Sequence, residues 1–401
     1  MPSFPPISIK TLELDTLLDI TNAINRQQDE DSLLKIFLFT LVANFKINKL
    51  AVYSREVGGW KPVLLHGLPT GHNIPQPILM QIGKNHGIIS VKKRLPDTVS
   101  TDFDVMIPVG RESRNVGIVL LGGLNRLSEQ ESSESLKFIQ TIANILTVAI
   151  QNIRLNHRRL EQQAIKKEIE LAKKLQSQLF PSFLPKDEKL HISSTYLPQL
   201  MVGGDYYDYI PLNENEFLLC IADVSGKGVP AAFIMSNLQS ALRILSKQNL
   251  SLTDIVSGLN ELVFENAKGE KFITFFIAKY NLQTYTIEYI NCGHNDPVIF
   301  FPDGNYQNMH EGTLMLGAFE KLPFISSGTV HNVKGTYLFA YTDGLTESFD
   351  RDNADNGLKI AVDIICEHLV DFQNIHRLLL DRMDTSLIPI DDITMLSCRV
   401  G

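Results

Sequence analysis

The stretch Ile221-Ala-Asp-Val-Ser-Gly-Lys-Gly-Val-Pro-Ala-Ala-Phe-Ile-Met-Ser236 determines the fold expected for the C-terminal half of the chain. The apolar run at residues 217–222 predicts a buried strand that ends on Asp223. The Ser-Gly-Lys-Gly turn and Pro230 then predict the start of a helix. The two glycines of the turn carry no side chains, so a ligand can approach the backbone closely. Taken alone, the stretch also fits a helix cap at Asp223 followed by an ordinary turn.

Three further loops carry aspartates beside small residues: Gly203-Gly-Asp-Tyr-Tyr-Asp208, Tyr341-Thr-Asp-Gly-Leu-Thr-Glu-Ser348 and Pro389-Ile-Asp-Asp-Ile-Thr394. Each alone fits a hairpin turn or a solvated loop. Collected at one site, their carboxylates would repel one another unless a cation shares the site. Mg²⁺ or Mn²⁺ prefers such oxygen ligands. Two ions bridged by one aspartate lower the pKa of a bridging water and hold a phosphoryl oxygen, so the loops together predict phosphoester hydrolysis.

These motifs, in this order, resemble those of metal-dependent PPM-type protein phosphatases, specifically the bacterial RsbU/SpoIIE branch. The matching residues are Val202-Gly-Gly-Asp-Tyr-Tyr-Asp208, Ala222-Asp-Val-Ser-Gly-Lys-Gly-Val-Pro-Ala-Ala232, Asn291-Cys-Gly-His-Asn295, Leu338-Phe-Ala-Tyr-Thr-Asp-Gly-Leu-Thr-Glu347 and Asp391-Asp-Ile-Thr-Met-Leu396. The resemblance spans essentially all of residues 190–401. It implies an αββα sandwich that removes phosphate from serine or threonine.

The resemblance also implies the site residues and two Mn²⁺ or Mg²⁺ ions. The expected metal ligands are Asp205, Asp223, the carbonyl of Val224, Asp343, Asp391 and Asp392. Asp223 is expected to bridge the two ions, and Asp205 to act with it in catalysis, directly on an ion or through water. Asp391 and Asp392 are adjacent, which leaves open which of them binds metal. His294 is expected to be a buried structural residue.

The resemblance further implies a substrate, a phosphorylated anti-anti-sigma protein of the STAS class. The alternative is a phosphatase fold that binds a partner without hydrolysis. Two other enzyme classes fit poorly. Gly203-Gly-Asp205 occurs in diguanylate cyclases, but there an acidic residue and Phe follow, where this chain has Tyr-Tyr-Asp. Gly226-Lys-Gly228 lacks the upstream glycine and the following Ser or Thr of a phosphate-binding P-loop.

Residues 1–150 predict a separate α+β sensor domain. Helices are expected at Leu17-Leu-Asp-Ile-Thr-Asn-Ala-Ile-Asn25 and from Asp31, and strands at Ile107-Pro-Val109 and Val116-Gly-Ile-Val-Leu-Leu-Gly-Gly123. A long helix is expected to begin after Ser128. This arrangement resembles a GAF domain, an antiparallel sheet with flanking helices. A pattern of core positions indicates the fold and leaves the ligand or partner of the domain unspecified.

A linker is predicted over residues 151–189, and its helix is expected to end at Pro181. Its apolar and polar seam positions step by threes and fours, with a slip in phase near Ala164: Leu146, Ala149, Ile153, Asn156, Leu160, Ile165, Ile169, Ala172, Gln176 and Leu179. This spacing predicts a coiled coil and a homodimer through residues 146–179, with Asn156 and Gln176 as register-setting polar positions. A single amphipathic helix lying on one of the domains is the alternative.

Composition narrows the remaining possibilities. The chain has 401 residues and a net charge of -8, which argues against a nucleic-acid-binding surface. Its four cysteines have neither metal-ligand spacing nor the pattern of a disulfide framework, as in a reducing cytoplasm. The N-terminus lacks the pattern of a signal peptide, and no apolar run has the length of a membrane span. A cytoplasmic α+β protein is therefore expected.

Overall fold

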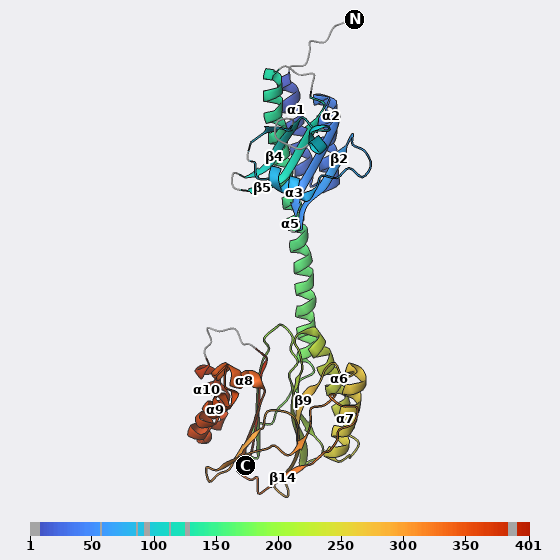
Figure 1. The fold of residues 1–401 in the computed structure, drawn as a ribbon. Coiled ribbons are helices and arrows are strands. Elements are labelled where there is room, and N and C mark those ends of the chain that lie inside the picture. Colours follow the sequence, from blue (N-terminus) through green and yellow to red (C-terminus); the bar gives the residue numbers. More distant parts are fainter. Residues whose placement is uncertain are drawn as a thin grey trace. The chain divides into compact units, whose positions relative to one another are not determined.

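The computed structural model describes residues 9–56, 58–85, 87–91, 97–111, 114–124, 129–383 and 391–401. Ser128 and Pro389, which belong to predicted motifs, lie outside these ranges. The chain divides into two compact units, Met1–Gln163 and Ala164–Gly401. The division falls inside the predicted linker of residues 151–189. Figure 1 shows the elements of each unit.

Unit 1 is built on an antiparallel sheet of five strands in the order β2-β1-β5-β4-β3. The strands are β1 (Lys49–Glu56), β2 (Gly59–His66), β3 (Ile89–Ser90), β4 (Val105–Arg111) and β5 (Arg114–Gly122). The helices are α1 (Ile9–Asn25), α2 (Glu30–Phe45), α3 (Gln76–Ile82), α4 (Asp97–Ser100) and the first part of α5 (Glu129–Ser177). Along β5, Val119 and Leu121 join a core with α1, α2 and α5, while Ile118 and Leu120 join a core with α3 on the other face. This is the predicted antiparallel sheet with flanking helices.

Helix α5 is continuous over 49 residues, about 73 Å at 1.5 Å per residue. It ends at Ser177, four residues before the predicted end at Pro181. Fewer of the predicted seam positions of α5 are available for packing against a second helix than expected. Leu146 and Ala149 are buried in unit 1, and Gln176 is buried in unit 2. Between them, five large apolar side chains of α5 are exposed: Leu155, Leu160, Ile165, Leu171 and Leu175.

Unit 2 contains two sheets. The first has the order β13-β10-β9-β8-β7, with β14 also paired to β10. Its strands are β7 (Tyr206–Pro211), β8 (Glu216–Val224), β9 (Ile273–Asn281), β10 (Thr286–Cys292), β13 (Gly312–Thr313) and β14 (Gly328–His331). The second has the order β12-β11-β15-β16-β6. Its strands are β6 (Leu190–Leu197), β11 (Val298–Phe300), β12 (Tyr306–Asn308), β15 (Tyr337–Tyr341) and β16 (Ile393–Val400).

Helices cover the outer face of each sheet (Figure 1). They are α6 (Val229–Leu245) and α7 (Leu252–Ala267) on the first sheet, and α8 (Asp343–Phe349), α9 (Ala354–His368), the 3-10 helix Leu369–Asn374 and α10 (Ile375–Arg382) beside the second. Successive side chains of a strand point to opposite faces of its sheet, so each sheet has two faces to cover. In β8, Leu218 faces the α6–α7 core, and Leu219 faces the second sheet. In β15, Leu338 faces the first sheet and Phe339 faces α9 and α10. The layers are therefore helix, sheet, sheet, helix, which confirms the αββα prediction.

Within the described part of the chain, no helix combines the length and apolarity needed to cross a membrane.

Candidate active site

The first sheet brings Asp205 and Asp223 to one edge. Asp223 is the penultimate residue of β8, and Asp205 directly precedes β7. These strands pair antiparallel with Tyr206 opposite Ala222, so the start of β7 lies beside the end of β8. Gly204 packs closely at this edge, because a Cβ there would lie 3.0 Å from the carbonyl oxygen of Val224. The Val224 carbonyl therefore lies against the loop that carries Asp205.

The second sheet places Asp343 and Asp391 at one of its edges in the same way. Strands β15 and β16 pair antiparallel with Tyr341 opposite Met395. Asp343 follows β15 by two residues, and Asp391 precedes β16 by two residues. Asp343 is the first residue of α8, so the hairpin turn considered for Asp343-Gly344 is not formed.

Hydrogen bonds to Asp205 join the two sheets at this edge. Its Oδ2 accepts from the hydroxyl of Thr342 at 2.9 Å and from the hydroxyl of Thr394 at 2.5 Å. The backbone N–H of Thr394 in turn donates to Thr342 Oγ1 at 2.8 Å. Asp205 is only 1% exposed. Two residues of the second sheet thus fix the orientation of a carboxylate that belongs to the first.

Both carboxylate oxygens of Asp392 accept hydrogen bonds from backbone N–H groups. Its Oδ1 accepts from the N–H of Gln199 at 2.7 Å, and its Oδ2 accepts from the N–H of Gly204 at 2.8 Å. A Cβ at Gly203 would lie 2.0 Å from Asp392 Oδ2, so this close approach requires glycine. Asp392 is 7% exposed. Asp392 therefore fixes the position of the loop that precedes Asp205.

Asp391 is placed differently from its neighbour. Its Oδ1 accepts from the backbone N–H of Asp392 at 2.8 Å, and its Oδ2 lies 2.9 Å from Nζ of Lys227. The Asp391 side chain is 34% exposed. This carboxylate faces accessible space at the site, whereas that of Asp392 is enclosed.

The last turn of α5 also contacts the site. Gln176 donates from Nε2 to the carbonyl of Gly203 at 2.7 Å and accepts from the N–H of Gly203 at 3.3 Å. It is 6% exposed. This result corrects the prediction that Gln176 is a polar position in a seam between two helices, because its amide is used inside unit 2. Gln176 thus holds Gly203, and Asp392 holds the next residue, Gly204.

Burial and the neighbouring negative charges both raise the pKa values of the cluster. Burial, followed by the charges of Asp343 and Asp391, raises the pKa of Asp223 to about 7. Burial and Asp223 raise the pKa of Asp205 well above its ordinary value. Burial and Asp391 raise the pKa of Asp343. The carboxylates are therefore close enough to resist ionisation together, and a shared cation relieves that repulsion.

The donor set fits a hard divalent cation, since it consists of carboxylates and one backbone carbonyl. Among the described residues, no three His, Cys, Asp or Glu side chains converge on a single point. Mg²⁺ usually keeps several waters and binds through one or two carboxylates, so it does not need three such side chains at one point.

Two residues of the predicted motifs have structural roles. Asp208 is fully buried and accepts from the guanidinium of Arg243 at 2.8 and 3.0 Å and from the hydroxyl of Tyr206. His294 is buried, with Nδ1 2.9 Å from the hydroxyl of Thr274. Burial lowers the pKa of His294 to about 4, so the imidazole is neutral, as expected of a structural histidine.

Several residues of this site were not predicted from the sequence. Thr342, Thr394 and Glu347 occur in the recognised motifs but received no role. Their positions in the sequence could have indicated a role. Each threonine lies within three residues of a candidate ligand, and Glu347 lies one helical turn after Asp343. Burial and then Asp343 raise the pKa of Glu347, so it belongs to the same acidic cluster. Lys227 was visible in the glycine turn, but no partner for it was predicted.

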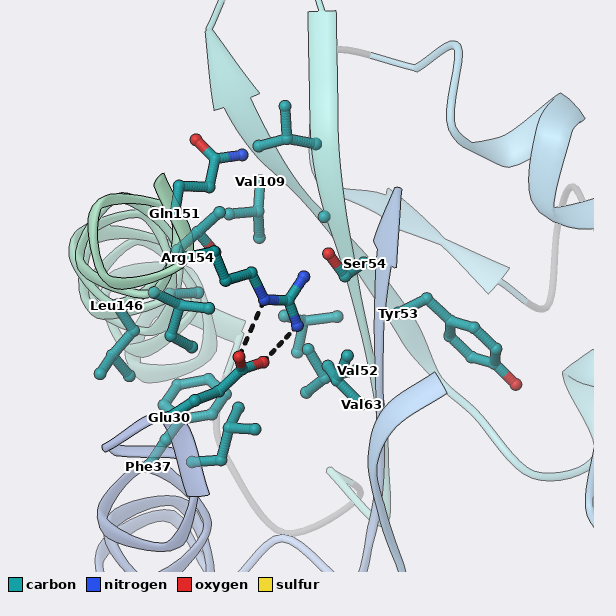
Figure 2. A pocket seen from close by; sticks show the side chains of 17 residues that line it. Glu30, Phe37, Val52, Tyr53, Ser54, Val63, Val109, Leu146, Gln151 and Arg154 are labelled. Atoms are coloured by element: carbon teal, nitrogen blue, oxygen red, sulfur yellow. Dashed lines mark hydrogen bonds and ion pairs between the residues drawn. The ribbon is translucent and has the colours of Figure 1, made fainter. Parts of the chain in front are cut away.

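Unit 1 holds a separate small cavity between its sheet and the helices α2 and α5 (Figure 2). Its walls include Val52, Val109 and Leu146. Arg154 of α5 donates from Nε to Glu30 of α2 at 2.8 Å beside this cavity. The cavity volume is about 40 Å³, which admits a few water molecules rather than an organic effector. The ion pair between Arg154 and Glu30 links α5 to α2 at this point.

The family-model match lies within unit 2. The family model for stage II sporulation protein E (SpoIIE) matches residues 213–401. Phosphoserine phosphatase RsbU of Bacillus subtilis (strain 168) is 31% identical over 248 residues, which cover 59% of this chain and 71% of RsbU. Phosphoserine phosphatase RsbP of the same strain is 28% identical over 187 residues, covering 45% of this chain and 46% of RsbP, so the chain spans less than half of that relative. The SiaA-PP2C domain of Pseudomonas aeruginosa shares the fold, with a TM-score of 0.51 and 17% identity over 60% of this chain and 99% of that one.

Proposed function

Because the chain belongs to the RsbU/SpoIIE family of PP2C-type serine/threonine phosphatases, we propose that unit 2 hydrolyses phosphoserine or phosphothreonine in a protein substrate. One observation carries the proposal: aspartates from two sheets meet at a shared edge. Hydrogen bonds from Thr342 and Thr394 to Asp205 hold these sheet edges together. A phosphatase fold that only binds a partner has no need for such a cluster of mutually repelling carboxylates.

Two Mn²⁺ or Mg²⁺ ions would be held by Asp223, the Val224 carbonyl, Asp343 and Asp391, with Asp205 acting directly or through water. When bound, such ions supply a water of lowered pKa and neutralise charge on the phosphoryl oxygens. We infer that Asp392 is a positioning residue rather than a ligand, because both of its oxygens already accept backbone N–H groups.

The residues of the chain itself prepare this site. The two threonine hydroxyls fix Asp205 in one orientation beside Asp223. Asp392 and Gln176 hold Gly203 and Gly204, the residues immediately before Asp205. Orientation of this kind lowers the barrier because the groups need not reorganise during the reaction.

The test uses the full chain, a phosphoserine peptide and a phosphorylated STAS protein. Release of inorganic phosphate should require Mn²⁺ or Mg²⁺, cease with a chelator and return when metal is added back. The STAS class is proposed for the substrate because the family resemblance implies it. Faster release from phosphorylated STAS proteins than from unrelated phosphoproteins supports this class, and equal or absent release refutes it. Metal binding without turnover on any phosphoprotein supports the non-catalytic binding module instead.

We further propose that unit 1 is a GAF-type sensor and that α5 forms a coiled-coil homodimer. The exposed apolar side chains of α5, from Leu155 to Leu175, support a helix that packs against a second copy. Gln176 gives a route by which the packing of α5 affects catalysis, since it binds the loop before Asp205. A signal at unit 1 acts only if it favours one packing of α5 over another.

A further inference from the structure

Lys227 places a positive charge at the accessible side of the acidic cluster. It lies in the loop between β8 and α6, and its Nζ is 2.9 Å from Asp391 Oδ2. The Lys227 side chain is 41% exposed. The ammonium group therefore reaches both the carboxylates and the space in front of them.

The backbone of the loop is built to place this side chain. Gly226 and Gly228, on either side of Lys227, have φ values of 96° and 73°, in the left-handed region that favours glycine. Before them, the N–H of Ser225 donates to the carbonyl of Phe272 at 2.9 Å, and the N–H of Phe272 donates to Ser225 Oγ at 3.0 Å. The loop is thus anchored at Ser225 and turns sharply on both sides of Lys227.

The charge of Lys227 also acts on Asp343 and Glu347 of the cluster. Burial and Asp391 raise the pKa of Asp343, and Lys227 opposes this rise. Burial, Asp343 and Asp391 raise the pKa of Glu347, and Lys227 again opposes the rise. A phosphoryl group that carries close to two negative charges is repelled by such a cluster, so its approach requires positive charge from the protein as well as from bound metal.

We propose that Lys227 binds the phosphoryl group of the phosphoprotein substrate, moving its ammonium group from Asp391 to a phosphoryl oxygen. This inference rests on the proposed phosphatase function and adds a substrate-binding residue to it. A divalent ion on Asp391 competes with Lys227 for that carboxylate and so weakens the contact between them. Lysine suits the role because its compact charge sits on a flexible stem with three donors.

A second lysine of the same region provides a matched control. Nζ of Lys271 would lie 2.5 Å from a Cβ at Gly226, so this ammonium also lies against the loop. Replacing Lys271 removes one positive charge near the site without removing the contact to Asp391. The pair of variants therefore separates a specific contact of Lys227 from the general field of the loop.

The experiment compares Lys227→Met, Lys227→Arg and Lys271→Met with the wild-type full chain. It measures kcat and KM on p-nitrophenyl phosphate and on a phosphopeptide, inhibition by inorganic phosphate, and Mn²⁺ affinity by calorimetry. Lys227→Met should raise KM and the phosphate inhibition constant about 10- to 100-fold, the size of a charge-assisted hydrogen bond. Lys227→Arg should recover part of this loss, and Lys271→Met should change each constant by no more than about threefold.

Mn²⁺ affinity separates the proposal from a structural role for Lys227. Lys227→Met should bind Mn²⁺ at least as tightly as the wild type, because a competing cation has left Asp391. Unchanged phosphate inhibition and KM in Lys227→Met overturn the inference, as does a fall in Mn²⁺ affinity that accounts for the lost activity. A wild-type chain without phosphatase activity refutes the proposed function, whereas an active wild type with an unaffected Lys227→Met refutes only this inference.

Discussion

Replacing Asp223 with asparagine should make the metal-free protein more stable while abolishing its activity. Asparagine has almost the same shape as aspartate but cannot ionise. In the wild type, burial and the charges of Asp343 and Asp391 raise the pKa of Asp223 to about 7. Above that pH the folded protein must carry a buried carboxylate that other carboxylates repel. The substitution removes this penalty and, with it, the proposed bridging ligand.

The size of the stabilisation follows from linkage between protonation and folding. A carboxyl whose folded pKa lies above its unfolded pKa contributes stability that is complete below the unfolded value and is lost as pH rises through the folded value. For Asp223 the window runs from the ordinary 3.8 to about 7, which corresponds to about 4 kcal/mol at most. The buried amide has its own cost of losing water. We therefore expect metal-free Asp223→Asn to exceed the wild type by about 2 kcal/mol at pH 8, and by little at pH 4.

The effect on catalysis has the opposite sign. Loss of a metal-activated nucleophile removes several kcal/mol of transition-state stabilisation, a factor of about 10³ or more in rate. Phosphate release by Asp223→Asn with saturating Mn²⁺ should therefore fall at least that far. The wild type should gain stability when Mn²⁺ is added at pH 8, and the variant should gain much less, because its bridging carboxylate is gone.

The assay is urea unfolding in the presence of a chelator at pH 4 and pH 8. Trp60, the only tryptophan of the chain, lies in unit 1, so its fluorescence reports that unit. A transition in circular dichroism without a change in fluorescence belongs to unit 2. Asp363→Asn, at an exposed position of α9, is the matched control and should change neither stability nor rate. Destabilisation of metal-free unit 2 by Asp223→Asn at pH 8 would refute the charge-repulsion argument, and a rate close to that of the wild type would refute the metal assignment.

Three further changes test other parts of the argument. Arg243→Ala should destabilise unit 2 by about 3 kcal/mol in urea unfolding, because Asp208 is fully buried and loses its charged partner; a change under about 1 kcal/mol contradicts this. Gln176→Ala should lower kcat about tenfold and weaken Mn²⁺ binding through loss of its two backbone hydrogen bonds, whereas Gln178→Ala, at an exposed neighbour, should do neither; equal effects of the two variants contradict the positioning role. One Ala inserted within residues 165–175 should shift basal activity strongly and four should nearly restore it, since a turn has about 3.6 residues; unchanged rate and oligomeric state after both insertions, and after deletion of residues 1–150, make the helix a passive tether.

Local patterns predicted the elements that carry the site. The apolar run at residues 217–222 is the centre of β8, and its termination on Asp223 followed by glycines correctly placed a carboxylate at a strand end. The quoted motif that starts at Leu338 likewise contains residues 338–341 of β15 ahead of Asp343. These predictions succeeded because burial on both faces of a strand leaves a continuous apolar run, and glycine marks the point at which the backbone turns.

The roles of single polar groups were beyond the reach of such patterns. Asp391 and Asp392 are adjacent and chemically identical, and only the backbone N–H groups of Gln199 and Gly204 distinguish them. Those donors come from residues nearly 200 positions away. Gln176 was assigned to an intermolecular seam because helical spacing shows which residues share a face, but not what that face contacts. The structure places its amide on Gly203.

The contact between α5 and the loop before Asp205 has a consequence for how this catalytic unit can be transplanted. The first strand of its sheets begins at Leu190, yet Gln176 and Phe180 lie upstream of it. The ring of Phe180 packs 4.9 Å from Tyr196 and 5.0 Å from Tyr207, measured between ring centroids. A chimera that joins a foreign sensor at residue 190 therefore discards the amide that holds Gly203 and the ring that packs on Tyr196 and Tyr207. The splice has to fall within α5, upstream of Gln176, and any replacement domain has to lead into unit 2 as an unbroken helix.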